Sequence, residues 1–173
     1  MKTLTFTVHG KPAAKGSARA MVHNQTGRAI VLPDNRKHLR SWEGVVRTAA
    51  IEATVNKDDG EVLWRMVQDQ PVAVIMEFRL ERPKARKLEV YPVTTPDLDK
   101  LARAVLDALQ NQVFADDKQV ARLLCQKRYA LAHEPPGVTV TVTTIGTNLE
   151  VWDAAMRGLL DAEAAGAEFE AGF

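Results

Sequence analysis

Two pairs of aspartates are the residues of this chain whose type and spacing best suit chemistry. They lie in the Pro-Asp-Leu-Asp sequence of residues 96–99 and in the Phe-Ala-Asp-Asp sequence of residues 114–117. Like charges repel one another, so this crowding is unfavourable unless a cation or a catalytic need compensates for it. Carboxylate oxygens are the ligands that Mg²⁺ prefers, and such ions promote displacement at a phosphodiester. We therefore predict a divalent-metal site, with the return from helix to strand bringing Asp117 back beside Asp97.

An acidic C-terminal segment conceals the basic character of the rest of the chain. The net charge is only +1, but residues 148–173 hold six acids and one base, Arg157. Without this segment the chain has 22 basic and 16 acidic residues, a net charge of +6. A basic body predicts a polyanionic partner, and nucleic acid is the partner we expect. The candidate contacts to its phosphates are Lys11, Lys15, Arg19, Arg82, Lys84, Arg86 and Lys87.

A predicted helix over residues 98–111 carries further charged candidates on one face. Asp99, Arg103 and Asp107 are spaced four residues apart, so their side chains share that face. We expect Arg103 to contact the scissile phosphate or the charge that develops on it, and Asp107 to orient Arg103. The alternative is a surface ladder of ion pairs, each worth about 0.2–0.5 kcal/mol.

Alternating apolar residues predict strands at three places, residues 4–8, 72–80 and 138–142. A mixed pattern predicts one more strand within residues 119–130. The basic residues 10–35 are predicted to form a long loop, or a hairpin with a flexible tip. A second basic loop is predicted over residues 81–96.

Helical spacing predicts a first helix from about residue 35 to residue 55, followed by the helix over residues 98–111. The apolar stripe of the first helix is Leu39, Trp42, Val45, Val46, Ala49 and Ala50. Thr147 and Glu150 form a capping-box pattern that predicts a terminal helix. The order of elements predicts an α/β or α+β fold, a small mixed sheet with helices packed on one face. We divide the chain into a nuclease domain, residues 1–147, and an acidic helix with a frayed tail, residues 148–173.

Several classes of protein are disfavoured by the sequence. The N-terminus alternates polar and apolar residues instead of forming the apolar core of a signal peptide, and no run is long enough to span a membrane. The single cysteine, Cys125, excludes an intramolecular disulfide and fits a cytoplasmic protein; we expect it to pack in the core. No motif for an organic cofactor is present.

The sequence from Pro96 to Leu109, followed by Phe114-Ala115-Asp116-Asp117-Lys118-Gln119-Val120, closely resembles the signature of the RusA family of Holliday-junction resolvases. The resemblance implies a small homodimeric α/β nuclease that nicks branched DNA in pairs with Mg²⁺ or Mn²⁺. The metal-binding aspartates of the family fall on Asp97, Asp99 and Asp117, with Asp116 as the neighbouring acid. The family's catalytic lysine falls on Arg103, its usual asparagine on Lys100, and a basic residue of the following strand on Lys127. A guanidinium keeps the charge of that lysine but does not readily transfer a proton. We add Lys100 and Lys127 to the candidate DNA contacts.

Two other hypotheses stay open on the sequence alone. Asp97 with Asp116 and Lys118 imitates the PD-(D/E)xK pattern of restriction-type nucleases, in which the second acid and the lysine lie on one strand. A non-catalytic protein that binds junctions or single-stranded DNA would also use the basic loops, with a steep dependence of affinity on salt.

Overall fold

A four-stranded sheet forms the centre of the fold, and its strand order is β1-β6-β4-β5. The structure is a computed structural model that describes residues 1–16, 36–86 and 88–146, and the backbone of residues 18–22 and 29–33. The four strands are β1 (Thr3–His9), β6 (Gly137–Thr144), β4 (Val72–Leu80) and β5 (Val120–Tyr129). β6 pairs antiparallel with β1 and β4, whereas β4 and β5 are parallel. The prediction of a mixed sheet is therefore confirmed.

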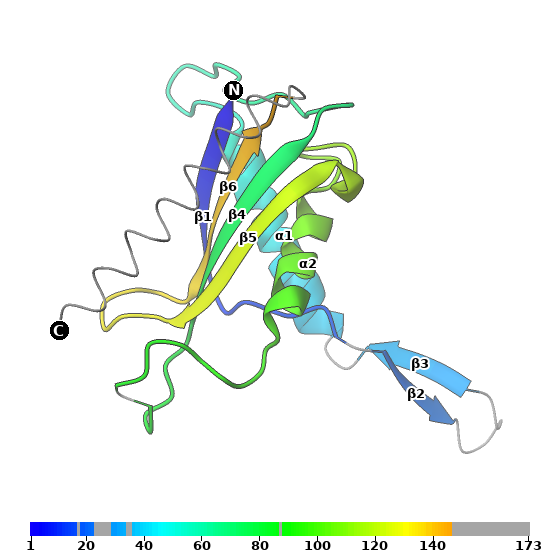
Figure 1. Cartoon of the computed structure of the whole chain (residues 1–173), viewed down its shortest axis with the longest axis vertical. Coiled ribbons are helices and arrows are strands. Elements are labelled where there is room, and N and C mark those ends of the chain that lie inside the picture. The colour runs from blue at the N-terminus through cyan, green and yellow to red at the C-terminus, as the bar shows by residue number, and fades with distance from the viewer. Residues whose placement is uncertain (17, 23–28, 34–35, 87, 147–173) are drawn as a thin grey trace.

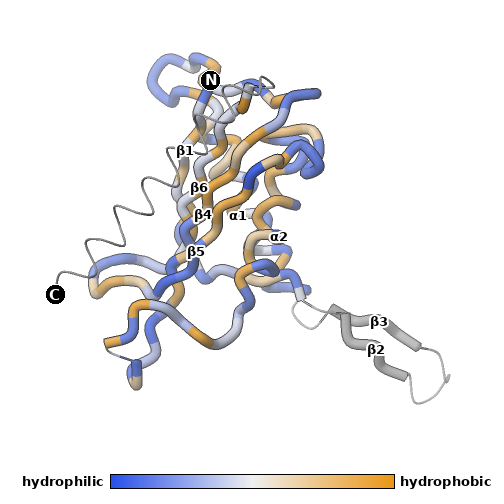
Figure 2. The backbone as a smooth tube through the Cα atoms, viewed as in Figure 1, coloured by the Kyte–Doolittle hydropathy of each residue, from blue (hydrophilic) through white to orange (hydrophobic). Residues whose placement is uncertain are grey.

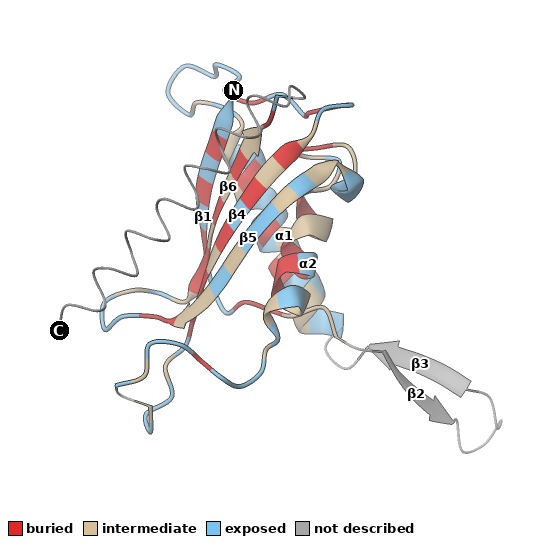
Figure 3. Cartoon of the chain, in the orientation of Figure 1, coloured by how far each residue is buried: buried red, intermediate tan, exposed pale blue. Residues whose placement is uncertain are grey.

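Two helices, α1 (Arg36–Ala53) and α2 (Leu98–Leu109), pack on one face of this sheet (Figure 1). Apolar residues of the strands and helices form one buried core, and Figures 2 and 3 show apolar residues and buried residues along these elements. The strands alternate because successive side chains point to opposite faces. In β1, for example, Leu4, Phe6 and Val8 are buried. The stripe predicted for α1 is wrong at Val45, which is 45% exposed, because the buried line of the helix runs through Trp42, Val46 and Ala50.

The parallel pairing of β4 and β5 determines where the ends of α2 lie. Parallel strands need a crossover connection, which here contains α2. The chain leaves β4 at Leu80, enters α2 at Leu98, and turns at residues 110–116 into the short 3₁₀ helix η1 (Asp117–Gln119) and then β5. Leu80 pairs with Tyr129, so the C-terminal ends of β4 and β5 lie together, at the end of the sheet where α2 begins.

Residues 10–35 contain a hairpin, as the second of the two predictions for this segment expected, and the predicted flexible tip lies outside the described residues. Its strands β2 (Ala18–Val22) and β3 (Ala29–Pro33) pair antiparallel and project from the body of the protein (Figure 1). The predicted terminal helix and the domain boundary at residue 147 lie outside the described residues.

The backbones of β1 and β6 approach closely at Gly137, which pairs with His9. A Cβ atom at Gly137 would lie 2.0 Å from the carbonyl oxygen of Val8, so only glycine fits without a shift of the backbone. None of the helices in the described ranges is long and apolar enough to cross a membrane.

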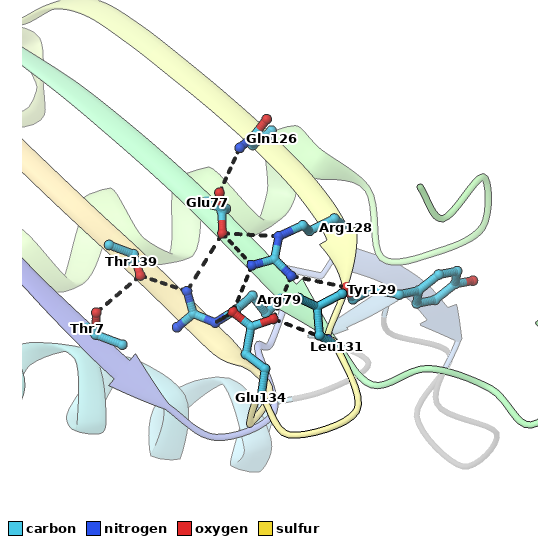
Figure 4. Close-up of polar contacts among 9 residues, drawn as sticks. All are labelled: Thr7, Glu77, Arg79, Gln126, Arg128, Tyr129, Leu131, Glu134 and Thr139. Carbon is cyan, nitrogen blue, oxygen red and sulfur yellow. Dashed lines mark hydrogen bonds and ion pairs between the residues drawn. The ribbon is translucent and has the colours of Figure 1, made fainter. Parts of the chain in front are cut away.

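An ionic network fastens β4 and β5 to the loop before β6, on the face of the sheet away from the helices (Figure 4). Arg128 donates to Glu77 at 2.8 Å and to both carboxylate oxygens of Glu134 at 2.6 and 2.7 Å. Arg79, which is 5% exposed, donates to Thr139 at 2.7 Å and lies 3.4 Å from Glu134. Hydrogen bonds from Arg128 lower the pKa of Glu134 to about 2.

Candidate active site

Asp97 and Asp99 lie together at the start of α2, where the first backbone N–H groups favour anions. Asp97 is the N-cap residue with an extended backbone, but its carboxylate does not cap the helix. Instead it accepts from Lys100 at 2.6 Å, and this ammonium lowers the pKa of Asp97. Asp99 is exposed in the first turn. Both carboxylates are open to solvent, and the ammonium group of Lys100 is paired with the carboxylate of Asp97.

Lys127, near the end of β5, fixes the segment that leads into α2. Its Nζ atom donates to the carbonyl oxygens of Thr94 and Pro96, both at 2.9 Å. Its charge also contributes to the lowered pKa of Asp97, after the larger effect of Lys100. The sequence predicted a DNA contact here and gave no signal for this anchoring role, which depends on the chain reversal that carries β5 back to the start of α2.

The second acidic pair divides into a structural residue and an exposed one. The Asp116 carboxylate accepts from the backbone N–H of Lys118 at 3.0 Å, while the Gln119 side chain accepts from the backbone N–H of Asp116 at 3.0 Å. This capping box holds η1, and the Lys118 N–H lowers the pKa of Asp116. Gln119 also donates to the carbonyl oxygen of Gln70 at 2.9 Å. Asp117 is exposed.

The prediction that Asp117 returns beside Asp97 within one chain is wrong. Lys127, which is bonded to Pro96, is at the far end of β5 from Asp117. The strand from Val120 to Lys127 spans about 23 Å at a rise of about 3.3 Å per residue. The 12 residues of α2 span about 18 Å at the helical rise of about 1.5 Å per residue. Among the described residues, no three His, Cys, Asp or Glu side chains are grouped so that they could hold a metal ion. The metal-binding role of the three aspartates stays a prediction.

Midway along α2, Arg103 is exposed. Asp107, one turn further along the helix, pairs with a residue other than Arg103. Asp107 pairs with the ammonium of Lys15, whose backbone N–H also donates to the carbonyl oxygen of Lys100 at 3.0 Å. Lys15 thus docks the segment before the β2–β3 hairpin onto α2. On the neighbouring helix α1, burial and then the charge of Asp107 raise the pKa of Glu43. The expected pairing of Asp107 with Arg103 is replaced by this contact.

A basic cleft of about 410 Å³ lies next to the segment that carries Asp97. Lys11, Arg82 and Lys84 line it, together with Pro96 from that segment. The cleft therefore joins basic residues from two loops far apart in the sequence and places them beside the acidic pair. The positive charges of Lys11, Arg82 and Lys84 are opposite in sign to the phosphates of a nucleic-acid backbone.

Not all the predicted phosphate contacts face this cleft freely. Arg82 donates to the carbonyl oxygen of Arg86 at 3.0 Å, and its guanidinium lies 5.3 Å from the centre of the Tyr129 ring. Arg86 donates to Glu89 at 2.6 Å. These two residues shape the loop after β4. The side chains of Arg19 and Lys87 lie outside the described residues.

The PD-(D/E)xK hypothesis conflicts with the local structure. In that pattern the second acid and the lysine share a strand, but here Asp116 and Lys118 belong to the capped turn at η1. The Lys118 ammonium lies 3.4 Å from Asp116, and its side chain is 79% exposed. Asp116 and Asp97 are also separated by the length of α2.

Two comparisons with known proteins found similar sequences. The family model described as endodeoxyribonuclease RusA matches residues 10–143, from the loop after β1 to the end of β6. An uncharacterized protein of Bacillus subtilis (strain 168), YqaN, is 27% identical over 146 residues, which cover 84% of this chain and 99% of the relative. The matched region contains both aspartate pairs, the basic cleft and Lys127. This chain belongs to the RusA family of endodeoxyribonucleases.

Proposed function

We propose that this protein is a Mg²⁺- or Mn²⁺-dependent homodimer that resolves four-way DNA junctions by paired nicking. Membership of the RusA family implies an endodeoxyribonuclease of the junction-resolving class. The observation that carries the finer proposal is the exposed pair Asp97 and Asp99 beside the basic cleft. Oxygen donors of this kind suit Mg²⁺ and Mn²⁺.

Each metal site in this proposal is shared between two copies of the chain. One copy supplies Asp97 and Asp99 at one end of α2, while its Asp117 lies about 20 Å away, much too far for a common ion. A twofold axis perpendicular to α2 and β5 makes the two copies antiparallel, so that Asp117 of one copy faces Asp97 and Asp99 of the other. β5 is an edge strand, whose outer edge can accept such a partner. Asp116 then keeps its capping role and orients Asp117.

The other residues of the site have separate roles in this proposal. A divalent ion held by Asp97 and Asp99 of one copy and Asp117 of the other would polarise the phosphodiester and lower the pKa of the attacking water. Arg103 contacts the phosphate and the charge that develops on it; its planar guanidinium suits that role and is unsuited to proton transfer. Lys127 holds the segment of residues 94–97 so that Asp97 stays in place. Lys11 and Lys84, which line the cleft, bind the phosphates of the DNA backbone and do not recognise its base sequence.

The test compares nicking and binding of a synthetic four-way junction by the wild type and three variants, with and without Mg²⁺. The wild type and the control Asp58→Asn, which changes an exposed aspartate in the turn after α1, are expected to nick the junction only with metal. Asp99→Asn is expected to bind and not nick. Metal-independent binding with no nicking by the wild type would instead support the non-catalytic DNA-binding protein. Loss of nicking in Lys118→Ala would support the PD-(D/E)xK hypothesis, because our proposal expects only weaker activity.

A further inference from the structure

The face of the sheet opposite α1 and α2 is built so that another element can cover it. Three pairs of threonines cross between β1 and β6, and their hydroxyl oxygens lie 3.1–3.2 Å apart. The pairs are Thr3 with Thr143, Thr5 with Thr141 and Thr7 with Thr139. Because these hydroxyls bond to each other, apolar side chains can cover the threonine methyl groups without leaving a polar group unpaired.

Beside this ladder lies an apolar hollow of about 220 Å³. Ile75 of the inner strand β4 and Leu124 of the edge strand β5 line it, and these two apolar side chains are 46% and 47% exposed. Arg122 lines it as well, and its Nη2 atom is buried without a hydrogen-bond partner among the described residues. A buried donor without an acceptor is costly. The hollow therefore lacks two things, an apolar cover and an acceptor for Arg122.

The chain itself carries a segment with both properties, and that segment follows closely after Ile145, which lines the hollow. Ile145 lines the hollow, and Glu150 follows five residues later, within a reach of about 17 Å. In residues 148–163 the apolar side chains Leu149, Trp152, Met156 and Leu159 recur at helical spacing. Glu150 and Asp153 flank this stripe. A helix of this length would measure about 24 Å, which fits the roughly 30 Å of a nine-residue strand such as β4.

We propose that residues 148–163 form an amphipathic helix that docks on the open face of the sheet of the same chain. The apolar stripe covers Ile75, Leu124 and the threonine methyl groups. A carboxylate from the acidic flank accepts from Arg122. The segment then makes the sheet the middle layer of three and covers the apolar part of the face next to the edge strand β5. This inference does not depend on the proposed nuclease function.

Limited digestion of the full chain with trypsin tests the proposal, because Arg157 is the one basic residue of residues 148–173. Cleavage there removes residues 158–173, and its rate follows the population in which the segment is undocked. Leu124→Glu places a charge in the hollow and is expected to speed cleavage at Arg157 about tenfold or more. Ile51→Glu is the matched control, since Ile51 is also 47% exposed but belongs to α1 on the opposite face. The control is expected to match the wild type.

Trp152→Glu changes the segment and leaves the sheet intact, so it tests the proposal even if Leu124→Glu fails to fold; it is also expected to speed cleavage. Circular dichroism checks the fold of each variant. Cleavage of the wild type at Arg157 as fast as in Trp152→Glu would overturn the proposal. Protection that increases with protein concentration would also overturn it, by showing that a second copy covers the face.

Discussion

Mixing two inactive variants should restore nicking if each metal site is shared between two copies. Asp97→Asn removes a ligand at the start of α2, and Asp117→Asn removes one at the start of β5. Each variant alone is expected to lose activity by about 100-fold or more, because an ion with one carboxylate fewer binds weakly. In a dimer of one chain of each kind, one site combines both lesions and the other site keeps all its carboxylates.

The expected size of the rescue follows from the symmetry. Random assortment of equal amounts puts about half of the dimers in the mixed form, and each has one intact site, so about one quarter of the wild-type sites return. A supercoiled plasmid that extrudes a cruciform gives the readout. Paired nicking makes it linear, whereas the mixed dimer, with one working site, should produce nicked circles.

The control mixture combines Asp97→Asn with Asp99→Asn, two lesions at the same end of α2. Every dimer in that mixture has a damaged ligand set at both sites, so no rescue is expected. Co-purification through a tag on one variant verifies that mixed dimers have formed. If verified mixed dimers of Asp97→Asn and Asp117→Asn stay inactive, the shared site is refuted.

Two substitutions and one labelling experiment test the fold and its electrostatics. Glu134→Gln should lower the free energy of unfolding by about 1–3 kcal/mol at pH 7. The wild-type Glu134 has a folded pKa of about 2, below its unfolded value of 4.5, so its charge stabilises the fold above pH 4.5. That contribution disappears as the pH falls to about 2, and the difference between variant and wild type in denaturant titrations should disappear with it. Gly137→Ala should cost about 1–3 kcal/mol, measured in the same way, because its Cβ meets the Val8 carbonyl. Burial raises the pKa of Cys125 to about 11, so iodoacetamide at pH 8 should alkylate it about 100-fold more slowly in the folded than in the unfolded protein.

The sequence predicted the elements of the fold well, because their patterns are local. Alternation in residues 72–80 reproduces β4 to the residue, since Val72, Val74, Met76, Phe78 and Leu80 are the buried apolar side chains of that strand. The start of α2 follows from its apolar spacing, but the predicted end at residue 111 lies two residues beyond the observed end at Leu109. The predicted apolar stripe of α1 was wrong at Val45. The width of the stripe that a helix buries depends on the surface against which it packs, and the spacing of apolar residues within the helix does not reveal that surface.

The geometry of the site was harder to predict because it depends on long-range pairing. Asp97 and Asp117 are only 20 residues apart, and the expected return of the chain is real. The returning residue that reaches Asp97 is Lys127, however, because Asp117 lies before the strand that makes the return. The roles of Lys15 and Gln119 have the same origin, since each bonds to a segment far away in the sequence.

The repulsion among the four aspartates is weak in the folded chain even without a metal ion. Charges about 20 Å apart are separated by twice the Debye length of about 10 Å at 0.1 M salt, so the two pairs barely interact within one copy. Within each pair, Lys100 binds Asp97 and Lys118 lies near Asp116. A single copy therefore tolerates its acids without a metal ion. In the proposed dimer the carboxylates meet only across the interface, where bringing them together is unfavourable until a divalent cation compensates for their charge. Assembly, cation binding and phosphodiester cleavage are then coupled, so that one copy alone cannot nick DNA.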